Sequence, residues 1–196
     1  MFRDVPQPIL NRMEQLEQID AADRLDGTPL TKRLKQITPE VGRFIAVLAA
    51  AAPDGQYVEV GTSAGYSTLW LALACRAVKR HITTFEVLAE KAQLAEETFR
   101  VTGVNDVVTF IHSDALSHLQ RYKDVSFCFL DADKEVYGEC YDTVVPRMVT
   151  GGILVADNAI SHEAELRHVL HRALTDDHVD ALVVPIGRGE LVCRKK

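Results

Sequence analysis

The sequence predicts a three-layer α/β sandwich, in which helices cover both faces of a mostly parallel sheet. From residue 57 onward, short apolar runs alternate with helical patterns, and most runs are almost continuously apolar. Such alternation is typical of parallel βαβ units, and continuous apolar runs indicate strands buried on both faces. The last two runs flank the turn Pro-Ile-Gly-Arg-Gly at 185–189, which predicts an antiparallel C-terminal hairpin.

The first 36 residues are expected to form a helical extension. Their apolar residues recur at helical spacing: Ile9, Met13, Leu16 and Ile19. A firmer helix is expected to begin at Thr38, which can cap it, because Pro39 suits the first helical position. We therefore divide the chain into a helical extension over 1–36 and one main domain over 37–196.

The remaining elements follow from the same two periodicities, with glycines and prolines at the boundaries. The expected strands are 57–60, 82–86, 107–111, 125–130, 153–156, 181–184 and 191–194. The expected helices are 66–78, 89–101, a short one from 115, 135–148 and 161–174. Together they predict a seven-stranded sheet whose last two strands form the hairpin.

Composition excludes several classes of protein. The chain has 196 residues with 22 basic and 28 acidic side chains, so its formal charge is −6. A mildly acidic chain is a poor general ligand for nucleic acid, whose binding depends on neutralising phosphates. No targeting segment or apolar run of about 20 residues is present, so we expect no membrane contact. Four cysteines without a CxxC pair predict reduced, buried thiols in a cytoplasmic protein.

The ends of the first two strands carry features of a nucleotide-type cofactor site. Gly61 and Gly65 let the backbone approach a ligand closely before a helix N-terminus, although Ser63 breaks a G-x-G-x-x-G pattern. Glu86 ends the second strand, where a carboxylate commonly binds ribose hydroxyls. A tight turn and a solvated acid are the alternative interpretations of these two features.

The later strand ends carry acids, an amide and one ammonium. Asp114 and Ala115 follow the third strand and could contact an adenine edge, although Asp114 could equally cap a helix. Asp131 and Lys134 follow the fourth strand, and Asp157-Asn158 follow the fifth. If those two strands are neighbours, these groups share one crevice, and such oxygen ligands suit a hard cation such as Mg²⁺. Helix caps and a structural salt bridge are the alternative.

Six motifs, in order and spacing, resemble one enzyme family. They are VEVGTSAGYSTLWLA (58–72), TTFE (83–86), HSDAL (112–116), FLDADKEVY (129–137), ILVADN (153–158) and PIGRGELVCRK (185–195). The family is the class I, S-adenosylmethionine-dependent and divalent-metal-dependent catechol and caffeoyl-CoA type O-methyltransferases, especially the small bacterial members. The resemblance implies a Rossmann-like class I methyltransferase fold, a small catechol-type aromatic acceptor and a homodimer.

The resemblance also implies roles for individual residues. The implied S-adenosylmethionine contacts are Glu59, Gly61, Thr62, Ser67, Glu86, Asp114, Ala115, Asp131 and Asp133. The implied ligands of Mg²⁺, or of Mn²⁺ or Ca²⁺, are Asp131, Asp157 and Asn158. Lys134 is implied as the general base, and Asp131 shares the catalytic site with it.

The chain departs from the family pattern in four places. Cys140 stands where a Tyr is common, Arg188 stands where an Asp is common, and the loop at 159–163 lacks the usual Trp and Gly. The N-terminal region has no clear match to the family's acceptor-binding segment. The alternatives are a metal-independent small-molecule methyltransferase and a cofactor-binding relative without catalysis. Retention of Lys134 with all three expected metal ligands favours a catalyst.

Overall fold

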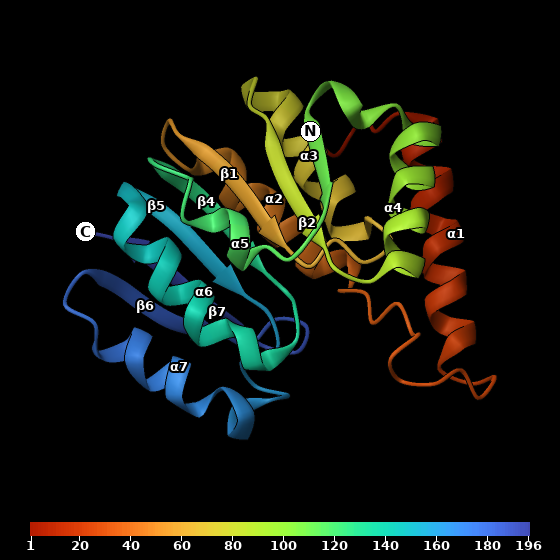
Figure 1. Ribbon diagram of the computed structural model, residues 1–196. Coiled ribbons are helices and arrows are strands. Elements are labelled where there is room, and N and C mark those ends of the chain that lie inside the picture. The colour runs from red at the N-terminus through yellow and green to blue at the C-terminus, as the bar shows by residue number, and fades with distance from the viewer.

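A central seven-stranded sheet with helices on both faces organises residues 1–196 of the computed structural model (Figure 1). Its strand order is β3-β2-β1-β4-β5-β7-β6, in which β1 to β5 pair in parallel. β7 pairs antiparallel with both β5 and β6. The α/β class, the mostly parallel sheet and the C-terminal hairpin are therefore confirmed.

The element bounds agree closely with the expected ones over most of the chain. The strands are β1 (Gln56–Val60), β2 (Ile82–Glu86), β3 (Val108–His112), β4 (Val125–Leu130), β5 (Met148–Ala156), β6 (Val179–Val184) and β7 (Glu190–Lys195). The helices are α1 (Gln7–Asp23), α2 (Pro39–Ala51), α3 (Tyr66–Val78), α4 (Ala89–Thr102), α5 (Leu116–Leu119), α6 (Tyr137–Val144) and α7 (Glu163–Thr175). Thr38 caps α2 as expected, because its hydroxyl accepts a hydrogen bond from Val41 N.

The helix expected over 135–148 is wrong at both ends. Residues 134–136 and 145–147 form 3₁₀ turns, and only Tyr137–Val144 is α-helical. Pro146 has no N–H to donate and clashes with the preceding turn, so an α-helix cannot continue through it. The chain then enters β5 at Met148, and the Gly151-Gly152 pair lies inside this strand instead of preceding it.

Two hydrophobic cores lie on opposite faces of the sheet. Helices α1 to α4 cover one face, where Ile45 of α2 and Leu71 of α3 pack on Phe127 and its neighbours. Helices α6 and α7 cover the other face around Leu130 and Leu154. Helix α1 contributes buried apolar residues to the first core, so the N-terminal helix packs as part of the same body.

All four cysteines are buried and unpaired, as expected: Cys75, Cys128, Cys140 and Cys193. Burial raises the pKa of the Cys140 thiol to about 12, so this residue is a small apolar group in the core under α6. None of the helices combines the length and apolarity that crossing a bilayer requires.

Candidate active site

The carboxyl ends of β1, β4 and β5 bring the expected site residues to one edge of the sheet (Figure 1). The hydrogen-bond ladder continues one residue past the strands, because Asp131 N donates to Val60 O at 2.9 Å and Asp157 N donates to Leu130 O at 3.0 Å. Asp131 and Asp157 therefore occupy neighbouring positions, as their places after adjacent strands predict.

Gly61, the first residue of the glycine-rich loop at 61–65, lies directly against the row of residues that follows the strands, at Asp131. Its φ is +102°, and a Cβ there would overlap the carbonyl oxygen of Asp131. Only glycine combines that backbone conformation with so close an approach. The expected cofactor residues around the loop at 61–65 (the cofactor half) and the expected cation residues around Asp131 (the cation half) are consequently two adjoining halves of one candidate site.

Glu59 belongs to β1 and is buried beneath the loop at 61–65, away from solvent. Its side chain is fully buried, and its two oxygens accept hydrogen bonds from Ser67 Oγ at 2.6 Å and Thr68 Oγ1 at 2.5 Å. Burial raises the pKa of Glu59, and the surrounding hydroxyls only partly oppose that shift. Glu59 thus anchors the start of α3, and its direct contact with a cofactor stays a prediction, as does that of Ser67.

Glu86 is held by three backbone donors. Its Oε2 accepts from Ser63 N at 2.8 Å, and its Oε1 accepts from Val87 N at 2.9 Å and Leu88 N at 2.8 Å. The carboxylate therefore closes the loop at 61–65 onto the end of β2, close to where a ribose is expected. Nearby, the buried hydroxyl of Thr62 forms a hydrogen bond with the hydroxyl of Thr84, a residue of β2.

The other expected cofactor residues lie around the rim. Asp114 is exposed, and its Oδ1 accepts from the backbone N of Leu116, the first residue of the short helix α5, at 3.0 Å. Ala115 beside it is buried, and Asp133 is exposed. A local hydrogen bond to the start of α5 therefore engages the Asp114 carboxylate in this structure, and an adenine contact stays a prediction.

Lys134 is the centre of the cation half. Its ammonium donates to Ala132 O at 2.9 Å and to Tyr137 Oη at 2.7 Å, and it lies 3.5 Å from Asp131 Oδ1. Tyr137 is fully buried, and its hydroxyl donates in turn to Asp157 O at 3.2 Å. Tyr137 thus links the Lys134 ammonium, which lies beside Asp131, to the backbone of Asp157.

Asp157 and Asn158 form a tight, buried pair. Asp157 Oδ1 accepts from Asn158 N at 2.7 Å, and Asn158 adopts a left-handed conformation with φ of +69°. Among non-glycine residues, asparagine tolerates that conformation best. The backbone therefore turns sharply here and holds both side chains at the end of β5.

Glu190, the first residue of β7, is a site residue that the sequence analysis did not identify. Its side chain is fully buried, and neither carboxylate oxygen has a hydrogen-bond partner. Burial raises the pKa of Glu190 to about 10, and the adjacent Asp157 carboxylate, with which the protonated Glu190 can hydrogen-bond, and the Asp131 carboxylate add to the shift. A charged residue at the start of an apolar strand that returns antiparallel to β5 is the signal that could have identified it.

The cation half has the composition of a divalent-cation site but not yet its geometry. Burial, and then the Asp157 carboxylate, raise the pKa of Asp131, which shows how poorly these negative charges are compensated. As the side chains lie, no three His, Cys, Asp or Glu residues are grouped as they would be around a metal ion. The donors fit a hard cation, and binding one would require rotation of side chains such as Asp131, which now pairs with Lys134.

The N-terminal segment borders the cofactor half. Ser63 Oγ donates to Leu34 O at 3.0 Å, and Leu34 N donates to Asp23 Oδ2 at 2.7 Å. The segment between α1 and α2 is thus attached both to α1 and to the loop at 61–65.

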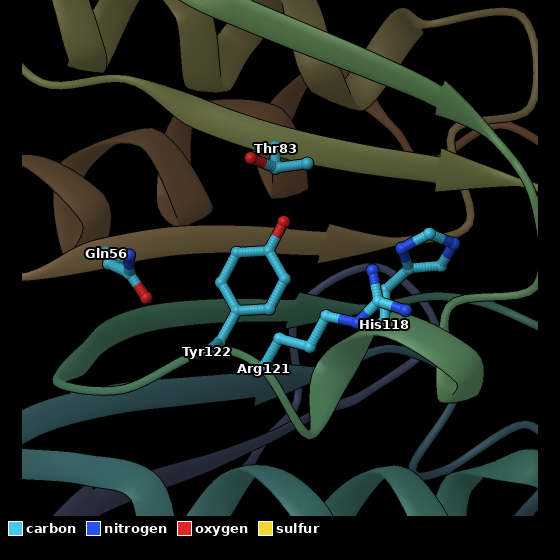
Figure 2. A pocket seen from close by; sticks show the side chains of 5 residues that line it. All are labelled: Gln56, Thr83, His118, Arg121 and Tyr122. Atoms are coloured by element: carbon cyan, nitrogen blue, oxygen red, sulfur yellow. The ribbon is translucent and has the colours of Figure 1, made fainter.

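A separate pocket of about 390 Å³ lies on the face of the sheet beside α5 (Figure 2). Its lining residues are Gln56, Thr83, His118, Arg121 and Tyr122. Figure 2 shows the Tyr122 hydroxyl directed toward Thr83, close to the amino-terminal ends of β1 and β2. The pocket contains none of the expected site residues, so it is distinct from the crevice at the strand ends.

Comparisons with known proteins agree with this geometry. A family model described as O-methyltransferase matches residues 13–196. An Arabidopsis thaliana protein, whose name proposes a caffeoyl-CoA O-methyltransferase, is 27% identical over 82% of this chain and 78% of its own length. A Mycobacterium tuberculosis protein named catechol O-methyltransferase is 30% identical over 63% of this chain and 57% of its own.

The solved structures extend the fold comparison to nearly the whole chain. The O-methyltransferase from Bacillus cereus, solved in complex with SAH, has a TM-score of 0.78 and 23% identity. The match covers 95% of this chain and 91% of that one. At 23% sequence identity, this structural similarity supports the fold alone.

Proposed function

This chain belongs to the O-methyltransferase family, and we propose on that basis that it moves the methyl group of S-adenosylmethionine to a hydroxyl of a small, catechol-type aromatic acceptor with Mg²⁺ assistance. The names of the Arabidopsis and M. tuberculosis relatives support the acceptor class. The SAH complex of the B. cereus protein supports the methyl donor.

One observation carries the proposal: a single lysine lies beside a carboxylate whose backbone directly adjoins the glycine-rich loop. Lys134 contacts Asp131, and Asp131 in turn adjoins Gly61. A proton acceptor, oxygen ligands and a cofactor loop thus meet within one crevice. Methyl transfer to a hydroxyl needs these three elements together, because donor and acceptor must be held in line.

The loop at 61–65 and Glu86 would hold the cofactor, which supplies a methyl group on a positively charged sulfur. The Glu86 carboxylate, which backbone N–H groups hold in place, gives this half a negative charge that favours such a cation. The bond between sulfur and methyl breaks as the bond between the acceptor oxygen and methyl forms. In that step the neutral amine of Lys134 takes the hydroxyl proton at Nζ.

Asp131, Asp157 and Asn158 would hold the divalent cation. When bound, the cation supplies positive charge that stabilises the deprotonated acceptor oxygen and orients it. Tyr137 has a positioning role in this proposal. Its hydroxyl accepts from Lys134 and donates to Asp157 O, so it keeps the amine next to the cation ligands.

The experiment is a methyl-transfer assay with labelled S-adenosylmethionine and a catechol, with and without added Mg²⁺. We expect transfer with Mg²⁺ or Mn²⁺ and its loss in excess EDTA. Full activity in EDTA would contradict the role of the cation. A protein that binds S-adenosylmethionine but methylates no catechol, flavonoid or hydroxycinnamoyl thioester would contradict the acceptor class.

A metal-independent small-molecule methyltransferase is the second candidate. The observation that favours it is the ion pair between Lys134 and Asp131, which satisfies the lysine without a cation. In that case Asp131 would orient Lys134 alone. The EDTA arm of the same assay separates the two candidates.

A further inference from the structure

Glu190 lies in the same row across the sheet as two of the expected cation ligands. Leu130 pairs with Ala156 across β4 and β5, and Ala156 pairs with Leu191 across β5 and β7. One residue further along the same register, Asp131, Asp157 and Glu190 are side by side. Paired positions on neighbouring strands direct their side chains to the same face, with Cβ atoms about 5 Å apart.

The Glu190 carboxylate is unusual among the buried acids of this chain. No N–H or O–H of the chain donates to either of its oxygens although the side chain has no exposure to solvent, and the Asp157 carboxyl lies next to it. Glu59 and Glu86, which are also buried, each accept at least two hydrogen bonds. A buried carboxylate without donors is strongly disfavoured, so such a group either stays protonated, as its raised pKa indicates for Glu190, or is compensated by a bound ion.

The charges in the row indicate which ion would compensate them. Asp131, Asp157 and Glu190 contribute three negative charges, and Lys134 contributes one positive charge. Burial favours the protonated, neutral form of Glu190 while no cation is bound, and two negative charges would remain once all four groups are ionised. A divalent cation supplies the missing charge, and carboxylate oxygens are its preferred ligands.

The backbone before Glu190 is held against the loop that follows Asn158. Ala159 N donates to Gly189 O at 2.8 Å, and a Cβ at Gly189 would overlap Ile160. Gly189 has a φ of +93°, so a glycine is needed to bring β7 this close. Glu190 is therefore positioned by the same turn that positions Asp157 and Asn158.

We propose that Glu190 is a further carboxylate ligand of the divalent cation held by Asp131, Asp157 and Asn158. This inference rests on the proposed function, because it assigns an additional ligand to that cation. It makes the site richer in carboxylate than two aspartates and one asparagine would be. We therefore expect tighter binding of the free cation than those three residues would provide.

The test is a titration of the whole protein with Mn²⁺, in which free Mn²⁺ is followed by electron paramagnetic resonance. We expect Glu190→Gln to raise the Kd for Mn²⁺ by about 10–100-fold, the range for disturbing groups around a metal. Glu165→Gln, which removes an exposed acid on α7, is the matched control and should leave the Kd unchanged. A Kd within twofold of the unmodified protein in Glu190→Gln would overturn the inference.

A second measurement confirms that the variant is folded and separates this inference from the proposed function. Calorimetric titration with S-adenosylmethionine, without metal, should give the same Kd for Glu190→Gln and the unmodified protein. If Asp157→Asn loses Mn²⁺ binding and Glu190→Gln keeps it, the inference fails and the proposed function stands. If the unmodified protein binds S-adenosylmethionine but no Mn²⁺, the inference and the proposed role of the cation both fail.

Discussion

The two halves of the candidate site at the strand ends differ in how their carboxylates are stabilised. In the cofactor half, Glu59 is paired with two hydroxyls and Glu86 with three backbone N–H groups. In the cation half, Asp131 and Asp157 share one row with Glu190, and Lys134 is the one positive charge among them.

This difference indicates which half depends on a ligand. Carboxylates that are hydrogen-bonded within the chain keep their positions in its absence. Carboxylates that face each other repel, and a cation relieves that repulsion. We therefore expect the cofactor half to be preformed and the cation half to become ordered when a divalent cation binds. The following substitutions test that distinction, from the largest expected effect to the smallest.

Replacing Lys134 should have the largest effect, because it removes the only base in the cation half. Lys134→Ala is expected to lower kcat by about 10²–10⁴-fold, the usual contribution of a general base. Cofactor binding, which belongs to the other half, should be unchanged. Steady-state kinetics and calorimetry measure the two quantities. Lys123→Ala, at an exposed position, is the control, and loss of cofactor affinity in Lys134→Ala would contradict the assigned role.

Gly61→Ala tests the point at which the two halves meet. An added Cβ would overlap Asp131 O in a backbone conformation that already disfavours side chains. We expect the free energy of unfolding to fall by about 3–4 kcal/mol. Gly103→Ala is the matched control, since φ is +64° there but no atom lies within 4 Å of the added Cβ. Gly103→Ala should lower the free energy of unfolding by about 1 kcal/mol, as measured by urea denaturation. Equal losses in Gly61→Ala and Gly103→Ala would show that the close approach of Gly61 to Asp131 is unimportant.

Glu86→Gln changes the cofactor half alone. Loss of the charged acceptor should weaken S-adenosylmethionine binding by about 1–3 kcal/mol. Mn²⁺ binding should remain as in the unmodified protein, because Glu86 lies outside the cation row. Calorimetry measures both, with the exposed Glu90→Gln as control. An unchanged cofactor Kd in Glu86→Gln would refute the predicted contact.

The smallest expected effect concerns pH and Glu59. Burial raises its pKa in the folded protein, so the folded state holds this proton more tightly than the unfolded state does. The stability of the unmodified protein relative to Glu59→Gln should therefore fall as pH rises above the unfolded value of about 4.3. Between the unfolded and the folded pKa of Glu59, each pH unit lowers the free energy of unfolding by at most about 1.4 kcal/mol. Urea denaturation at pH 5 and pH 8 measures it, and a difference that does not change with pH would contradict the shift.

Local sequence patterns were sufficient for the order of elements and for the positions of the candidate residues at the strand ends. The strand ends at Glu86, Asp131 and Asp157 were predicted correctly, because short apolar runs bounded by polar residues mark buried strands. The helix over 135–148 was predicted too long, since its apolar periodicity outweighed the stop signal at Pro146. The hydrogen bonds of Glu59 were not predicted, because no local pattern shows that the Ser67 and Thr68 hydroxyls donate to it.

The amino-acid sequence by itself determined the α/β class, the family motifs and the set of groups that follow β1 to β5. Only the tertiary structure decided that Glu190 joins Asp131 and Asp157 in one row. Its position depends on the register between β5 and β7, which are separated along the chain by α7 and β6. Register of that kind is set by long-range packing and by the turns at Asn158 and Gly189, and hydrophobic periodicity within one segment carries no information about it.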